Sequence, residues 1–154
     1  MMAIFHETFT FAINLSVPPE RAFAAYVDTA LRATWSAPNP NTQISIIESD
    51  VCTGGSEVTK CGPMGGDLLY QLDISYHLVE QNKLISFTEV LREGRAKLTA
   101  ALVTFEFRKR TDGTTDLHVA DQVTSFVGNG GLEGHSEGYA NALKNLAALF
   151  EEES

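Results

Sequence analysis

The sequence contains few basic residues and no long apolar segment. It has 11 lysines and arginines against 20 aspartates and glutamates, which gives a formal net charge of −9 at pH 7. This balance repels phosphate backbones and anionic lipids, so neither nucleic acid nor a membrane surface is an expected partner. No apolar run approaches the roughly 20 residues that span a bilayer, and the first residues do not resemble a secretion signal. We therefore expect a cytoplasmic protein.

Cysteine is scarce as well. Cys52 and Cys61 have no companion cluster of histidines and cysteines at the spacing of a zinc site. If Gly54-Gly55 forms a two-residue turn, Cys52 lies opposite Glu57 and Cys61 lies opposite Glu48, so the thiols are not cross-strand partners. We expect no disulfide, no metal site and no permanent cofactor.

The composition is otherwise that of a folded domain. Of 154 residues 44% are hydrophobic, and 12 glycines and five prolines are too few for a disordered or fibrous chain. A chain of this length can bury a substantial core. No repeat or linker divides it, so we predict one domain over residues 1–154, with its core at about residues 8–150.

Hydrophobic periodicity predicts an α+β order of elements. Apolar residues alternate over residues 9–17, which is typical of a strand, and Pro18-Pro19 ends that strand and begins the first of two short helices. From Gln43 to Val127 the chain reads as antiparallel strands joined by turns. Apolar residues spaced i, i+3, i+4 and i+7 then predict a long amphipathic helix from near Glu133 to near Glu151. A curved antiparallel sheet covering one side of this helix is the expected architecture.

The strand patterns also predict cross-strand neighbours. The clearest strand has an apolar face running from Leu68 to Leu78, and pairing across the turn that follows places Tyr76 beside Phe87 and Ile74 beside Glu89. In the last hairpin, two sets of inward residues face each other. These sets are Ala101, Val103, Phe105 and Phe107 against Leu117, Val119, Asp121 and Val123.

Several short motifs occur in an order that resembles the START-like, helix-grip superfamily. They are residues 16–23 before the first helix, Trp35 after the second, Gly54-Gly55, residues 84–89, residues 113–117, and Gly138-Tyr139 followed by Leu143 and Leu146. Within the superfamily the sequence is most similar to the Hsp90 ATPase activator homologue-like and polyketide cyclase-like family. It departs from the family where Trp35-Ser36 replaces a tryptophan pair, Tyr139 replaces a tryptophan and Asp121 replaces a frequent histidine.

The resemblance implies a cavity between the concave sheet and the long helix, of the mostly apolar kind that binds small molecules. The residues expected to line it are mainly aromatic and aliphatic, with two carboxylates among them. They are Trp35, Tyr70, Ile74, Tyr76, Phe87, Glu89, Phe105, Asp121, Tyr139 and Leu143.

Glu89 and Asp121 are the most informative of these residues, because a carboxylate on an apolar face must be paired, hydrated or protonated. One interpretation makes Glu89, Asp121 and Tyr139 catalytic candidates for proton transfer, and another makes the carboxylates ligand anchors. A third pairs them with a cation such as Arg92, Arg32 or Lys97. His135, in the first turn of the long helix, is expected at the surface, with a positive helix end that disfavours its protonation.

These observations lead to three functional hypotheses. We expect a protein that binds a small apolar or amphipathic molecule. A cyclase- or hydrolase-like enzyme that uses the cavity carboxylates is the second hypothesis. The third, which the family resemblance suggests, is a module that binds a chaperone or another protein partner. A homodimer formed through the sheet edge is compatible with all three.

Overall fold

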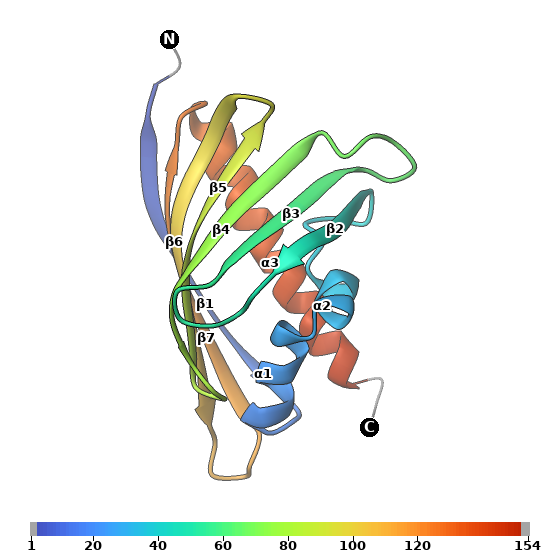
Figure 1. Ribbon diagram of the computed structural model, residues 1–154. Coiled ribbons are helices and arrows are strands. Elements are labelled where there is room, and N and C mark those ends of the chain that lie inside the picture. The colour runs from blue at the N-terminus through green and yellow to red at the C-terminus, as the bar shows by residue number, and fades with distance from the viewer. Residues whose placement is uncertain (1–2, 152–154) are drawn as a thin grey trace.

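The alternating strands of the chain pair into one antiparallel sheet that curves around a long helix (Figure 1). The computed structural model describes residues 3–151. The elements are β1 (Phe5–Leu15), α1 (Pro19–Val27), α2 (Thr29–Trp35), β2 (Thr42–Ser49), β3 (Ser56–Pro63), β4 (Tyr70–Glu80), β5 (Leu84–Glu93), β6 (Ala96–Lys109), β7 (Thr115–Ser125) and α3 (Asn129–Glu151). The seven strands are ordered β1-β7-β6-β5-β4-β3-β2. The predicted α+β class and helix-grip arrangement are confirmed.

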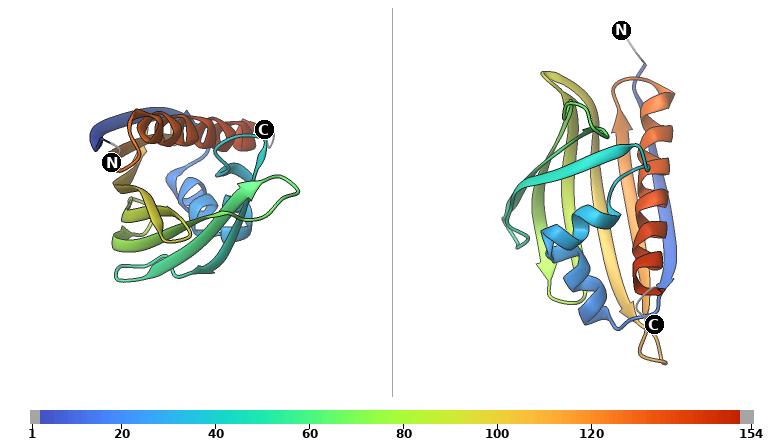
Figure 2. Two further views of the ribbon diagram at one scale, coloured as in Figure 1. Left: turned by 90° about the horizontal axis from the view of Figure 1, so that it is seen from above. Right: turned by 90° about the vertical axis from the view of Figure 1, so that its right-hand side faces the viewer.

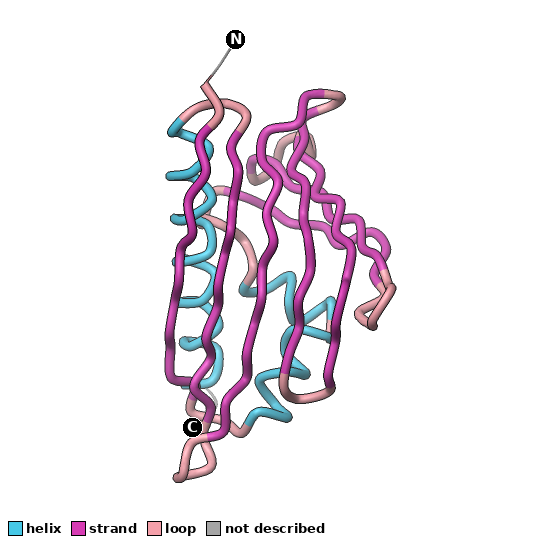
Figure 3. Tube along the Cα trace, turned by 90° about the vertical axis from the view of Figure 1, so that its left-hand side faces the viewer, coloured by secondary structure: helices cyan, strands magenta, loops and turns pink. Residues whose placement is uncertain are grey.

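The long helix covers only part of the sheet. α3 packs against β1 and β7, and runs alongside them in Figure 3. Its buried residues are Leu132, Ala142, Leu143, Leu146 and Phe150. In Figure 2 the sheet bends so that β2, β3 and β4 lie opposite α3, while α1 and α2 lie at one end of the space between helix and sheet. Within residues 3–151 no helix is long and apolar enough to cross a membrane.

The predicted registers of the central hairpins are confirmed. Tyr76 pairs with Phe87 and Ile74 pairs with Glu89 across β4 and β5. Between β6 and β7, Val103 pairs with Asp121 and the other inward residues meet as predicted. Because side chains alternate between faces along a strand, this register places both carboxylates on the concave side of the sheet.

The ends of β4 differ from the prediction. Leu68 lies in the loop before the strand and is 37% exposed, and Leu78 is 42% exposed. A register shift between Tyr76 and Leu78 turns the end of the strand, so Leu78 no longer shares the face of Tyr76. The apolar alternation therefore continues in the sequence beyond the part of the strand that faces the core.

The loop that joins β2 and β3 is longer than a two-residue turn. Ser49 pairs with Glu57, and a register shift between Ile46 and Glu48 leaves Cys61 opposite Ile44, so the predicted partners of the cysteines are wrong. Cys52 lies in the connecting loop and is exposed, whereas Cys61 is half-buried, and both thiols are free.

α3 begins at Asn129, four residues before the predicted start. The early turn contains glycines, which are poor helix formers, so the periodic pattern begins only after them. Packing explains their presence, because a Cβ on Gly131 would lie 2.1 Å from Oγ of Ser125. Glycine thus allows the first turn of α3 to approach the end of β7 closely.

A buried ion pair attaches α2 to the sheet. Arg32 donates from Nη1 and Nη2 to the two carboxylate oxygens of Glu57, at 2.8 and 2.5 Å. Ser49, Thr59 and Tyr76 also donate to that carboxylate. Burial opposes ionisation of Glu57, but the Arg32 guanidinium outweighs it and lowers the pKa of the carboxyl. The pair is neutral overall and has its hydrogen bonds satisfied.

Replacing Arg32 with methionine should therefore destabilise the fold strongly. The change leaves the Glu57 carboxylate buried without its cation, which costs about 3–5 kcal/mol. Arg108→Met is the control, because Arg108 and its partner Glu106 are 58% and 43% exposed and such pairs contribute little. Urea unfolding measures the free energy of unfolding of both variants. Equal losses would contradict the structural role of the Arg32–Glu57 pair.

Candidate ligand-binding site

The part of the sheet that α3 does not cover borders a cavity of about 990 Å³. Residues of β2 to β6 form one wall, residues of α3 form the other, and Trp35 of α2 lies at one end. Most of the wall is aromatic or aliphatic. The volume falls within the range of small-molecule sites, which extends from roughly 300 to 1,000 Å³.

Most of the residues expected in the pocket lie along this cavity. Its lining includes Trp35, Tyr70, Ile74, Phe87, Glu89, Phe105 and Tyr139. Phe87 and Phe105 are in tilted contact at a centroid distance of 6.1 Å, and Tyr139 contacts Phe105 at 6.4 Å. These rings connect the sheet wall to the helix wall.

Three of the expected pocket residues do not line the cavity. The Tyr76 hydroxyl is 3.0 Å from the Tyr26 hydroxyl and donates to Glu57, so its side chain is held in the core. Leu143 is buried in the core on the packed face of α3. Asp121 is fully buried and is hydrogen-bonded to His135, which itself lines the cavity. Each lies on the concave side of the molecule, but another side chain stands between it and the open space.

His135 connects the two inward carboxylates, and the expected surface position is wrong. Its Nδ1 is 2.6 Å from Oδ2 of Asp121, and its Nε2 is 2.9 Å from Oε1 of Glu89. The imidazole is 7% exposed. His135 lies in the second turn of α3, four residues before Tyr139, and both side chains are on the face of the helix that borders the cavity. The cation that pairs with the carboxylates is therefore His135, and not Arg92, Arg32 or Lys97.

The environment of His135 favours the imidazolium. Burial alone would favour the neutral ring, but hydrogen bonds to Asp121 and Glu89 and their charges raise its pKa from 6.5 to about 10. Both ring nitrogens then donate a proton to a carboxylate. The positive end of the helix was expected to disfavour protonation of His135, whereas the raised pKa favours it. Burial raises the pKa of Asp121, and His135 partly offsets that effect.

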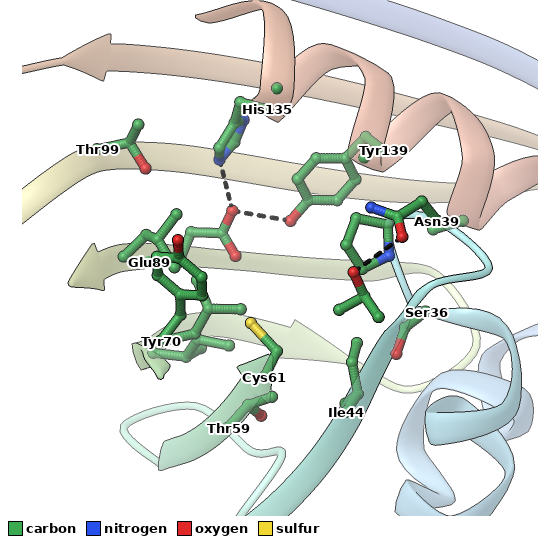
Figure 4. A pocket seen from close by; sticks show the side chains of 18 of the residues that line it. Ser36, Asn39, Ile44, Thr59, Cys61, Tyr70, Glu89, Thr99, His135 and Tyr139 are labelled. Carbon is green, nitrogen blue, oxygen red and sulfur yellow. Dashed lines mark hydrogen bonds and ion pairs between the residues drawn. The ribbon is translucent and has the colours of Figure 1, made fainter. Parts of the chain in front are cut away.

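Tyr139 completes the polar cluster. Its hydroxyl donates to Oε1 of Glu89 at 3.1 Å (Figure 4). Burial, together with the charges of Glu89 and Asp121, raises the pKa of Tyr139 well above its usual value, so the hydroxyl keeps its proton. Oε2 of Glu89 has no hydrogen-bond partner within residues 3–151 and faces the cavity.

Thr99 and Arg32 also line the cavity, although neither was expected there. Thr99 is 2% exposed, and its Oγ1 has no hydrogen-bond partner in the described part of the chain. The period-2 pattern of β6 could have found it, because Thr99 precedes inward Ala101 by two residues. Arg32 gave no comparable signal, because its partner Glu57 is 25 residues away in the sequence, beyond the whole of β2. Among the described residues, no group of three or more histidine, cysteine or acidic side chains is arranged to hold a metal ion.

The fold and the cavity together define a START-like protein of the helix-grip type. The sequence matches the family described as Activator of Hsp90 ATPase homolog 1-like protein over residues 16–151, and the chain belongs to that family.

Solved structures share the fold. An uncharacterised protein from Rhizobium leguminosarum has a TM-score of 0.84 at 23% identity, over 97% of each chain. A protein from Rhizobium loti has a TM-score of 0.79 at 28% identity, over 95% of this chain and 98% of its own. DynU16, a protein in the dynemicin biosynthetic locus, has a TM-score of 0.68 at 18% identity, over 94% of this chain and 47% of its own. No curated protein matched the sequence.

The raised pKa of His135 predicts a pH-dependent contribution to stability. A group with a higher pKa in the folded than in the unfolded state stabilises fully below the unfolded value, near 6.5, and loses that contribution as pH rises through about 10. The contribution is on the order of 3–5 kcal/mol. The stability difference between the wild type and His135→Gln should therefore shrink between these pH values. An NMR titration should also show the His135 ring protonated at neutral pH, and a neutral ring there would contradict the assignment.

Thr99→Val should leave the protein equally stable or stabilise it by about 1 kcal/mol, because the lost hydroxyl has no partner in the fold. Thr59→Val is the matched control, since Thr59 also lines the cavity but donates to Glu57 at 3.1 Å. It should lose about 1–2 kcal/mol. Thermal unfolding of the two variants measures the contrast, and a loss for Thr99→Val as large as that for Thr59→Val would refute it.

Proposed function

We propose that this protein binds a small apolar or amphipathic molecule in the cavity between its sheet and α3. The observation that carries the proposal is the cavity of about 990 Å³ with an aromatic wall and one polar cluster. Protein interiors are normally packed with few voids larger than a water molecule. A cavity of this size leaves many side chains without packing partners unless a ligand supplies them.

The cavity has a buried aromatic floor and a side that is open to solvent. Phe87 and Phe105 are each 2% exposed, yet both line the cavity. Gly134, on the wall formed by α3, has no atom within 4 Å of the position that its Cβ would occupy. The helix thus leaves room where a larger side chain would fill the space.

A second candidate function is proton transfer on the bound molecule. Oε2 of Glu89 is open to the cavity, and a carboxylate in that position can act as a general base. Tyr139 can donate a hydrogen bond from the same side. His135 is unsuited to the role of base, because both of its nitrogens already donate to carboxylates. Cyclase-like chemistry therefore rests on Glu89 and Tyr139, and not on Asp121.

The family description also suggests a chaperone-binding role for this chain. The support from the surface is small, because the exposed apolar residues are distributed over several elements. They include Ile4, Phe5, Ile47, Met64, Leu69 and Leu102. We therefore rank this hypothesis below ligand binding.

Filling the space beside Gly134 should weaken binding without unfolding the protein. Gly134→Leu places a side chain in the open space and replaces a poor helix former, so stability should be kept or improved by up to about 1 kcal/mol. Native mass spectrometry of the wild type identifies a co-purified molecule, and Nile red fluorescence measures uptake of a neutral apolar probe. We expect Gly134→Leu to weaken both signals.

Two variants control this experiment. Gly134→Ala gains helix propensity but adds only one methyl group, and Ala148→Leu adds the same side chain at an exposed position of α3. Both should bind Nile red like the wild type. A wild type that takes up neither a natural ligand nor the probe would overturn the proposed function, whereas a Gly134→Leu variant that binds normally would show that the ligand does not occupy the space beside Gly134.

A further inference from the structure

The charges around the cavity do not balance. Two cations, Arg32 and His135, and two carboxylates, Glu57 and Glu89, are the charged side chains in its lining within the described residues. Asp121 lies directly behind His135, at 2.6 Å, and adds a third carboxylate. With the acids ionised and His135 protonated, the group carries one net negative charge. Because the site is largely apolar, this charge is poorly screened by solvent.

Neither cation is available to bind an acidic ligand. Both terminal nitrogens of Arg32 donate to Glu57, and its Nε donates to the main-chain carbonyl of Tyr26 at 2.9 Å. His135 uses both ring nitrogens on Asp121 and Glu89. An anionic group in the cavity would meet the excess negative charge without a free positive partner.

Two polar atoms on the same wall are instead unused. Oε2 of Glu89 faces the cavity, while Oε1 of that carboxylate accepts hydrogen bonds from His135 and Tyr139. Oγ1 of Thr99 is buried and has no partner. Thr99 pairs with Leu91, two residues from Glu89 on the adjacent strand, so the two side chains face the same side of the sheet. Figure 4 shows Thr99 and Tyr139 on opposite sides of His135.

We propose that the ligand of this cavity is an amphipathic amine, with an aromatic or aliphatic body and a protonated nitrogen that binds Oε2 of Glu89. The inference rests on the proposed function, because it names the class of molecule that the same site takes. A protonated amine supplies the charge that the trio of Glu89, His135 and Asp121 lacks.

The neighbours of Glu89 suit such a ligand. Phe87 precedes it by two residues on the same face of β5, and Ile74 is its cross-strand partner. Phe105 and Tyr139 add ring surface close to the carboxylate. Aromatic rings attract a nearby cation through their π faces and also pack against an apolar body. The carboxylate thus favours the charged end of an amphipathic amine, and the rings favour its apolar end.

Three naphthalene probes with the same ring system test the inference. Naphthylmethylamine is a cation at neutral pH, naphthylmethanol is neutral and naphthoate is an anion. Calorimetric titration of the wild type should give an affinity for the amine about tenfold or more above that for the alcohol, and the weakest affinity for naphthoate. This series needs no variant, so it stands even where a substitution prevents folding.

Glu89→Gln then identifies the group responsible. Glutamine keeps an oxygen that accepts from His135 and Tyr139 but removes the charge, so amine affinity should fall about tenfold while alcohol affinity stays within about twofold. Glu93→Gln makes the same change at an exposed position of β5 and should alter neither affinity.

The outcomes separate the two proposals. An amine that binds no more tightly than the alcohol, or not at all, overturns the inference, and so does an amine preference that survives in Glu89→Gln. In each of these cases uptake of Nile red by the wild type would leave the proposed function intact. If Nile red, the amine and the alcohol all fail to bind, the proposed function fails first.

Discussion

The packing of α3 on one half of the sheet is the constraint on which the cavity depends. The helix uses its buried face, which includes Leu143 and Leu146, against β1 and β7. The strands on the other side of β5 in the sheet, β4, β3 and β2, bend round to lie opposite the helix. Because side chains cannot span the resulting distance, a space remains that is bounded by the sheet on one side and by the helix on the other. Trp35 and the short helices then close one end of it.

Burying this many side chains around an open space requires that their charges be satisfied, and the molecule does so in two different ways. Arg32 and Glu57 form a neutral pair whose hydrogen-bonding atoms are used within the fold, which is what a structural ion pair needs. Glu89 and Asp121 share the single imidazole of His135, so within residues 3–151 one oxygen of each carboxyl group, Oε2 of Glu89 and the buried Oδ1 of Asp121, has no hydrogen-bond partner. The first cluster connects α2 to the sheet. The second cluster faces the cavity and still has a carboxylate oxygen, Oε2 of Glu89, that can accept a hydrogen bond.

Much of the scaffold and part of the site were predictable from local patterns. Period-2 alternation gave the correct pairs in β4–β5 and β6–β7, including Ile74 with Glu89 and Val103 with Asp121. These hairpins are joined by short turns, so a register error of one residue would have moved every apolar side chain to the wrong face. The β2–β3 hairpin was predicted less well, because its loop is longer and a bulge interrupts the pairing.

The residues alone were enough to establish the α+β class, the concave faces of the central strands and the presence of two carboxylates on them, because these follow from periodicity within short segments. The tertiary structure decided what those carboxylates meet. His135 shares the face of α3 on which Tyr139 lies, one turn later, and Gly131 lets this end of the helix approach the end of β7 closely enough for contact with both carboxylates. The tertiary structure also decided which inward residues line the open space and which, like Tyr76 and Leu143, are buried in the core. Both outcomes depend on distances between elements far apart in the chain, which no local pattern encodes.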